Sequence, residues 1–172
     1  MQNRDEIFKI AVRENERRIY GICCHYFGPG DDAKDAFQEI LLKVWLNLPG
    51  FRQEAKLSTW ISRIAVNVCL TFVTGPHKKH IVLAGENFPV ACDQAEEAET
   101  DNSLEEEKLA FFKEFTAGLN PVDKSLVSLY LEDLDYREIS QITGLSEVNA
   151  RTRIHRIKGQ IKKEWEEKHG TR

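Results

Sequence analysis

The sequence lacks long apolar runs, and this excludes one large class of proteins. No stretch of the 172 residues approaches the ~18 consecutive apolar residues that a membrane-spanning helix needs. The first residues, MQNRDEIFKI, show no apolar segment behind a basic cluster, so we expect no signal peptide. With 41% apolar and 30% charged residues, the composition is typical of a soluble folded protein. We therefore expect a cytoplasmic protein that is not integral to a membrane.

Cysteine is scarce, and the residue sets of common active sites are missing. The four cysteines, Cys23, Cys24, Cys69 and Cys92, form no CxxC pair, so we expect reduced and mostly buried thiols. The HKKH motif at 77–80 could in principle hold a metal, but it has no nearby cysteine or carboxylate partner. We find no paired catalytic carboxylates, no glycine-rich nucleotide loop and no Ser/His/Asp set. We expect no metal, no cofactor, no small-molecule substrate and no enzymatic activity.

Negative charge is confined to the middle of the chain. Ten basic and nine acidic groups give residues 1–73 a charge of +1, and eleven and ten give residues 111–172 the same. Residues 74–110 hold three basic and nine acidic groups, a charge of −6 within a total of −4. No strand-like alternation and no internal repeat is present. The pattern predicts an all-α protein with two small helical domains, at 1–75 and 109–172, joined by an acidic linker at 76–108.

The first domain is expected to contain three or four helices, and the second of these has two distinct faces. It should begin at Asp31 or Asp32 and end near Leu48. Its core face is Ala33, Phe37, Ile40, Leu41, Val44 and Leu48. The opposite face carries Asp35, Glu39, Leu42 and Leu46, bordered by Gln38 and Trp45. Two leucines beside two acids suggest a protein-docking surface, although they could also pack under a neighbouring helix.

A further helix, capped by Ser58 or Thr59 and running to about residue 73, also has two stripes. The core stripe is Leu57, Ile61, Ile64, Val68 and Phe72. The second stripe is Trp60, Arg63, Asn67 and Thr71, and the preceding loop adds Phe51, Arg52 and Lys56. An aromatic ring, a cation and an amide on one ridge can bind bases and phosphates. The alternative is a tryptophan at a domain seam among solvated polar neighbours.

The C-terminal part reads as a helix-turn-helix. A helix with Asn120 as cap and Pro121 in its first turn precedes it. A short helix at 137–143 is followed by Gly144, which is expected in a left-handed turn. Leu145 is expected to pack into the core between the helices, and Ser146 to cap the next helix.

The last helix carries the basic segment of the chain. Residues 151–163 include six basic side chains and no acid. Its core residues are expected to be Ala150, Ile154, Ile157, Ile161 and Trp165. The other side presents Asn149, Thr152, Arg153, Arg156 and Lys163, with Arg151, Lys158 and Lys162 on the flank. Because the apolar and the basic side chains fall on different sides of this helix, the pattern predicts a DNA recognition helix. The alternative is a basic face that is exposed to solvent and binds nothing.

Together the motifs DDAKDAFQEILLKVW, FRQEAKLSTWISRIAVN and LNPVDKSLVSLYLEDLDYREISQITGLSEVNARTRIHRIK resemble a bacterial extracytoplasmic function (ECF) sigma factor. The resemblance covers nearly all of the chain except the linker. It implies that Asp35, Gln38, Glu39, Leu42 and Leu46 bind the β′ clamp of core RNA polymerase. It assigns the promoter −10 element to Phe51, Arg52, Lys56, Trp60, Arg63 and Asn67. It assigns the −35 element to Asn149, Arg151, Thr152, Arg153, Arg156 and Lys158, in a domain that rests on the β flap.

The resemblance also concerns the linker and further partners. It implies that the acidic linker threads toward the polymerase active-site channel, and its charge is expected to limit non-specific DNA binding by the free chain. It further implies an anti-sigma partner. In one place the sequence departs from the family, because VCLTFVTGPHKKH follows Asn67 where an aspartate and several arginines are usual. Lys78 and Lys79 are the only cations with fixed charge there.

Two other functions fit parts of the sequence. A stand-alone helix-turn-helix regulator would explain the C-terminal half equally well, but not the Asp/Glu/Leu face or the Trp/Arg/Asn ridge. A helical protein-interaction module with a basic face would bind no specific DNA sequence.

Overall fold

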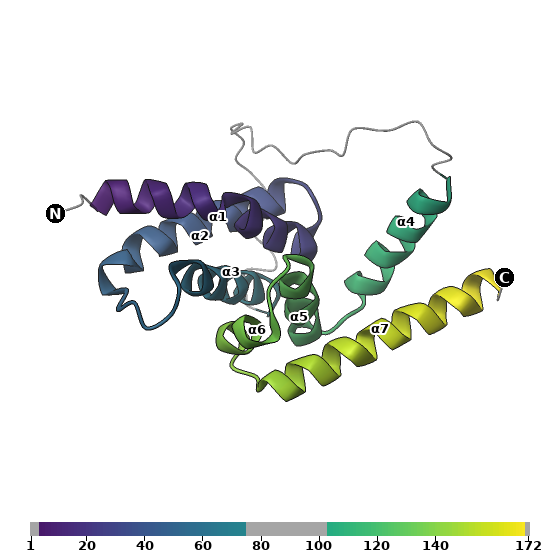
Figure 1. Cartoon of the computed structure of the whole chain (residues 1–172). Coiled ribbons are helices and arrows are strands. Elements are labelled where there is room, and N and C mark those ends of the chain that lie inside the picture. The colour runs from purple at the N-terminus through teal and green to yellow at the C-terminus, as the bar shows by residue number, and fades with distance from the viewer. Residues whose placement is uncertain (1–3, 75–102, 171–172) are drawn as a thin grey trace.

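The computed structural model describes residues 4–74 and 103–170, and all regular structure within these ranges is helical (Figure 1). The elements in chain order are α1 (Arg4–Phe27), α2 (Asp31–Asn47), the short 3-10 helix η1 (Leu48–Gly50), α3 (Leu57–Thr74), α4 (Ser103–Ala117), α5 (Pro121–Leu131), α6 (Tyr136–Thr143) and α7 (Glu147–His169). The helices α1, α2 and α3 pack on one another, and α5, α6 and α7 form a second group. The all-α, two-part architecture predicted from the sequence is confirmed.

The first group is closed by the turns that the sequence indicates. Gly28, at φ 75°, ends α1 because its left-handed backbone lets its N–H donate to the Cys24 carbonyl at 2.8 Å. Asp31 and Asp32 lie in the first turn of α2, where acids favour the helix N-terminus. Of the expected core face of α2, all but the half-buried Leu41 are buried.

The predicted cap of α3 is wrong. The helix begins at Leu57, so Ser58 and Thr59 already lie in its first turn, and the Trp60 N–H donates to the Lys56 carbonyl at 3.0 Å. Thr59 is buried, and its hydroxyl has no hydrogen-bond partner in the described chain. The helix therefore starts before both of the residues predicted to cap it.

More of α3 is buried than one core stripe requires. Ile61 and Val68 are buried as expected, but so are Ala65, Val66 and Cys69, and α3 is in contact with α5 and α6 as well as with α1 and α2. By length and a mean hydropathy of 1.3, α3 could cross a membrane. Here it is instead the central helix of a folded core, and exposed polar side chains interrupt its remaining face.

The second group is built on the predicted helix-turn-helix, with one difference at its start. Asn120 caps α5, since its side chain accepts from the Asp123 N–H at 3.0 Å. Preceding this core, α4 begins at Ser103, within the segment predicted to be linker. It packs on the far end of α7, where the rings of Phe111 and Trp165 lie 5.2 Å apart. The HKKH motif, Cys92 and most of the acidic stretch lie outside the described residues.

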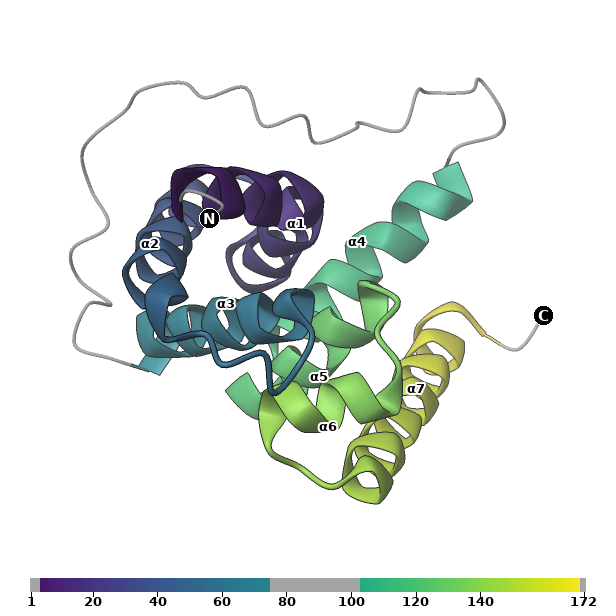
Figure 2. The ribbon, with the colours of Figure 1, turned by 60° about the vertical axis from the view of Figure 1, so that its left-hand side comes forward.

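The two groups of helices are in direct contact, with α5 and α6 lying against α1 and α3 (Figure 2). A buried hydrogen bond joins the Tyr26 hydroxyl to Ser125. The Ser125 hydroxyl also donates to the Pro121 carbonyl at 2.9 Å, so Tyr26 is the donor to Ser125. Burial raises the pKa of Tyr26 well above its ordinary value of 10.0.

This pKa shift predicts a loss of stability at alkaline pH. The folded chain keeps the Tyr26 phenol neutral, whereas the unfolded chain ionises it near pH 10.0. The contribution of Tyr26 is therefore complete below pH 10 and decreases as the pH rises further. Tyr26→Phe should cost about 0.5–1.5 kcal/mol at neutral pH through the lost hydrogen bond, and this cost should shrink above pH 10.

Denaturant unfolding of both proteins between pH 8 and 11 measures this difference. The buried thiol of Cys69, whose pKa is also raised through contact with Cys23 and burial, is present in both proteins. A cost that stays constant across the pH range would contradict the role given to Tyr26.

Candidate DNA and polymerase interfaces

Local hydrogen bonds fix the start of α6 and the turn between α6 and α7, and the sequence predicts those of Gly144 and Ser146. Asp135 caps α6 by accepting from the Glu138 N–H at 2.7 Å. Gly144 takes the left-handed conformation at φ 76°, and its N–H donates to the Ser140 carbonyl at 2.9 Å. Ser146 then caps α7 by accepting from the Asn149 N–H at 3.2 Å.

The side chains of α7 are sorted as expected. Ala150, Ile154 and Ile157 are buried, and Ile161 and Trp165 are half-buried. We call the opposite side the α7 polar face, defined as Asn149, Arg151, Thr152, Arg153, Arg156 and Lys158. All of these are exposed except Arg153, which is half-buried. Ahead of them at the helix tip, the apolar side chain of Val148 is 73% exposed.

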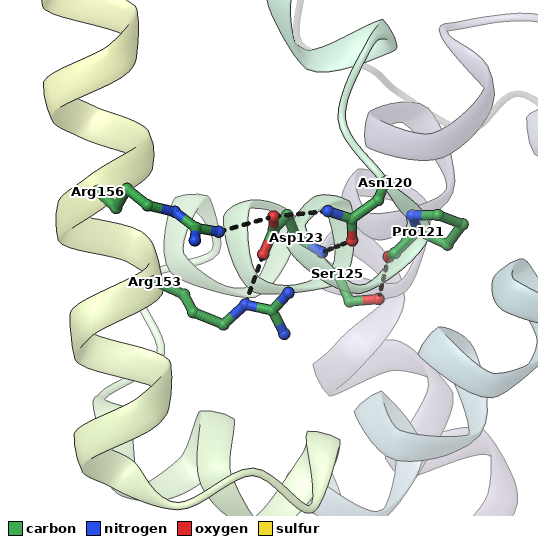
Figure 3. Close-up of polar contacts among 6 residues, drawn as sticks. All are labelled: Asn120, Pro121, Asp123, Ser125, Arg153 and Arg156. Atoms are coloured by element: carbon green, nitrogen blue, oxygen red, sulfur yellow. Dashed lines mark hydrogen bonds and ion pairs between the residues drawn. The ribbon is translucent and has the colours of Figure 1, made fainter.

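Asp123 of α5 explains the partial burial of Arg153 (Figure 3). Its side chain is only 5% exposed, and it accepts from the amide of Asn120 at 2.7 Å. The Arg153 Nε atom lies 2.9 Å from one oxygen of this carboxylate, and Arg156 Nη2 lies 3.4 Å from the other. A buried carboxylate requires such partners, so Asp123 ties the polar face of α7 to the core of its domain.

Two further cations of the α7 polar face rest on aromatic rings. The Arg151 guanidinium lies 4.9 Å from the centre of the Tyr136 ring on α6. The Lys158 ammonium lies 4.0 Å from the centre of the Tyr130 ring on α5 and also bonds its hydroxyl. Cation–π contacts of this kind restrict long side chains that would otherwise lose rotamer entropy on binding. The positive charge of α7 is thus held in place before any ligand arrives.

The predicted ridge on α3 is present. We call it the α3 ridge and define it as Trp60, Arg63 and Asn67 together with the loop residues Phe51, Arg52 and Lys56. Arg63 and Asn67 are exposed, while Trp60 is half-buried with its ring 5.2 Å from that of Phe51. Lys56 Nζ lies 3.1 Å from the Glu138 carboxylate of α6, so one cation of the ridge already has a partner.

On the predicted docking surface of α2, Gln38, Leu42 and Leu46 are exposed, whereas Asp35 and Glu39 are half-buried. We call this surface the α2 outer face, defined as Asp35, Gln38, Glu39, Leu42 and Leu46. Leu42 is 51% exposed and Leu46 is 61% exposed, so neither packs under a neighbouring helix. Trp45 at its border is half-buried, against the ring of Phe8 at 5.1 Å and beneath the guanidinium of Arg4 at 4.1 Å. Two accessible leucines are therefore framed by polar side chains.

The sequence pattern did not predict the residues on neighbouring helices that contact the side chains of these surfaces. Asp123, Glu138, Tyr130 and Tyr136 were not among the predicted site residues. A signal existed for Asp123, because an acid three residues after an N-cap asparagine lies at the start of a helix. No local pattern marks the two tyrosines, since their partners come from another helix.

The role of Asp123 can be tested by Asp123→Asn. The variant keeps the shape of the side chain but removes the charge that Arg153 and Arg156 face. We expect the free energy of unfolding to fall by about 1–3 kcal/mol. The matched control is Glu114→Gln, which removes a carboxylate from an exposed ion pair with Lys168 and should change it by less than about 0.5 kcal/mol. Equal urea midpoints for the two variants would refute the anchoring role.

The chain matches two protein-family models, sigma-70 region 2 over residues 11–76 and sigma-70 region 4 over residues 113–161. The ECF RNA polymerase sigma-E factor of Haemophilus influenzae is 26% identical over 167 residues, covering 93% of this chain and 88% of the relative. That of Escherichia coli K12 is 26% identical over 161 residues, covering 90% and 84%. The ECF RNA polymerase sigma factor SigW of Bacillus subtilis is 22% identical over 158 residues, covering 86% and 82%.

The two family models coincide with the two groups of helices and together extend over more than half of the 172 residues. The long alignments to ECF relatives span both groups. The chain therefore belongs to the sigma-70 family and, within it, to the ECF group of sigma factors, which bind core RNA polymerase and direct it to promoters.

Proposed function

We propose that three surfaces of this chain divide the work of promoter recognition. The α2 outer face binds the β′ clamp of the polymerase, the α3 ridge opens and reads the −10 element, and the α7 polar face reads the −35 element. One observation carries the proposal. On each of these helices, polar or apolar side chains suited to binding stay accessible while the opposite side of the same helix is buried.

The α2 outer face suits a protein partner. Leu42 and Leu46 offer apolar area at the centre, and burial of such area drives association. Asp35 and Glu39 lie beside them and would add charge complementarity to a basic partner surface. Glu39 already pairs with Lys43 at 3.3 Å, an exposed contact that a stronger partner can replace.

The α7 polar face suits the major groove of DNA. Asn149 lies in the first turn, where the side chains of a recognition helix reach base edges, and an asparagine can bond both N6 and N7 of adenine. Arg151, fixed over Tyr136 on the flank, is placed for a phosphate. Arg153 and Arg156 share the Asp123 carboxylate, so they contribute positive charge from a fixed position.

The α3 ridge suits unpaired bases. A base leaving the stack can lie on the exposed part of Trp60, while Arg63 and Asn67 bond the backbone or the base edge. Unstacking costs a few kcal/mol, which such contacts must offset. Lys78 and Lys79, the cations of the segment that departs from the family pattern, lie outside the described residues.

Further partners follow from the same proposal. The region 4 domain, at about 109–172, would rest on the β flap, and an anti-sigma protein would hold the chain inactive. The polymerase supplies the chemistry, so we expect this chain to act in the cytoplasm without catalytic activity of its own. A stand-alone regulator, by contrast, would bind a two-fold-symmetric operator without polymerase and would leave the α2 outer face without a role.

Reconstitution with core RNA polymerase on a promoter library tests the proposal as a whole. Transcripts should arise only when this chain is present, and the active promoters should share sequence at both elements. Operator binding without polymerase, and no transcripts with it, would favour the stand-alone regulator.

The α2 outer face can be tested by Leu46→Asp. Because Leu46 is 61% exposed, the free energy of unfolding should change by less than about 0.5 kcal/mol. Affinity for core polymerase should fall more than about tenfold, since an acid would be placed in an apolar contact. Ile10→Asp, at an exposed apolar residue of α1, is the matched control and should keep core binding. A collapsed fold in Leu46→Asp would show that Leu46 belongs to the core.

The α7 polar face can be tested by comparing Asn149→Ala with Arg151→Ala. Asn149→Ala should cost about 1–3 kcal/mol on the preferred −35 sequence and relax the preference at one base pair. Arg151→Ala should weaken binding equally on all sequences. It should also reduce the slope of log affinity against log salt concentration by about one. Binding by the polymerase complex to a set of −35 variants at two salt concentrations separates the two outcomes. Uniform weakening by both variants would show that Asn149 contacts the backbone.

A further inference from the structure

Val148, in the first turn of α7, is an apolar side chain that the fold itself does not explain. It is 73% exposed, more than any other large apolar side chain among the residues that the structure describes. Valine is also a weak helix former, because its branched Cβ restricts the rotamers of the side chain in a helix. The chain therefore gains little stability from a valine at this position, and we looked for its role in binding.

The tip of α7 differs in charge from the rest of the helix. Residues 147–150 include one acid and no base, whereas the six basic residues of α7 before its last turns lie between Arg151 and Lys163. Glu147 is favourable at a helix N-terminus, but its charge repels phosphate. Phosphates attract the cations further along, so the tip is placed over base edges when α7 lies in a groove.

The side of the tip that carries Val148 offers an apolar contact rather than a hydrogen bond. Thr152 lies one turn further along the same side of the helix. Its hydroxyl donates to the Val148 carbonyl at 2.8 Å, so this proton is already engaged within α7. Asn149, about 100° around the helix from Val148, is the neighbouring residue that can bond a base edge.

The major groove of DNA presents one group that matches an exposed valine. Thymine carries a 5-methyl group there, whereas the edges of the other bases present hydrogen-bond donors and acceptors. Contact between this methyl group and Val148 would remove apolar area of both from water. The Cα atoms of Val148 and Asn149 are about 3.8 Å apart, close to the spacing of about 3.4 Å between base pairs. Such a thymine would therefore lie within about two base pairs of the adenine proposed for Asn149.

We propose that Val148 determines specificity by contacting the 5-methyl group of a thymine in the −35 element. This step rests on the role proposed above for the α7 polar face. It adds to that role an apolar contact, so that the preference at one base pair depends on a methyl group. Uracil, which has the hydrogen-bonding groups of thymine without the methyl group, is then discriminated against at that position.

Deoxyuridine in place of each −35 thymine, one position at a time, tests the contact. The binding species is core RNA polymerase with this chain, and the DNA is a promoter selected from the library described above. Deoxyuridine keeps the base pairing of thymine and lacks only the methyl group. We expect one position at which it weakens binding about three- to fivefold, the effect of one buried methyl group.

Val148→Ala assigns the methyl contact to its residue. The variant should bind the thymine and the deoxyuridine promoters equally well. Because Val148 is exposed, its urea midpoint and its affinity for core polymerase should stay as in the parent chain. The matched control is Val122→Ala, since Val122 is also the second residue of a capped helix and is 41% exposed. This control should keep the full effect of deoxyuridine.

Three results would overturn the proposal. A deoxyuridine effect that persists in Val148→Ala would place the methyl group against another residue, such as Thr152. Weaker binding of Val148→Ala to core polymerase alone would show that Val148 contacts a protein. A parent chain that prefers a −35 sequence but ignores deoxyuridine would refute the methyl contact and leave the proposed role of α7 intact. The absence of any −35 preference would instead refute that role, and the methyl contact with it.

Discussion

The buried carboxylate of Asp123 is the constraint on which the second domain depends. It closes the first turn of α5 together with Asn120, and it gives Arg153 and Arg156 a fixed partner. Two residues further on, about 200° around the helix, Ser125 bonds Tyr26 of the first domain. One turn of α5 therefore contacts α7 on one side and the neighbouring domain on the other. A substitution in this turn would therefore affect both α7 and the contact with the first domain.

Much of the fold could be predicted because its determinants are local. Gly144, Ser146 and Asn120 each satisfy backbone groups within a few residues of themselves, so their patterns in the sequence are sufficient. The sorting of α7 and the exposure of Leu42 and Leu46 follow from helical periodicity, which depends only on spacing. Where one side of a helix is buried and the other is exposed, the spacing of apolar and polar residues predicts which side is which.

The rest depends on partners that are distant in sequence. Ser58 and Thr59 look like caps, yet α5 and α6 help to bury this side of α3 and the helix begins earlier. Glu138 reads as an ordinary residue near a helix start, but it meets Lys56, 82 positions away. Gly21 of α1 lies beside the carboxylate of Glu132 from the second domain, a contact that no local pattern indicates. Such contacts require the arrangement of the two domains, which periodicity does not contain.

The anchoring of α7 has a consequence for how promoter preference could change over evolution. Four of the six residues of the α7 polar face are tied to partners in their own domain, and the Thr152 hydroxyl is bonded to the Val148 carbonyl at 2.8 Å. Replacing the tied cations would alter the domain itself as well as its proposed contact with DNA. Val148 and Asn149, both exposed at the tip, escape this constraint. If α7 reads the −35 element as proposed, new preferences are most accessible through substitutions at these two positions, with little loss of stability to compensate.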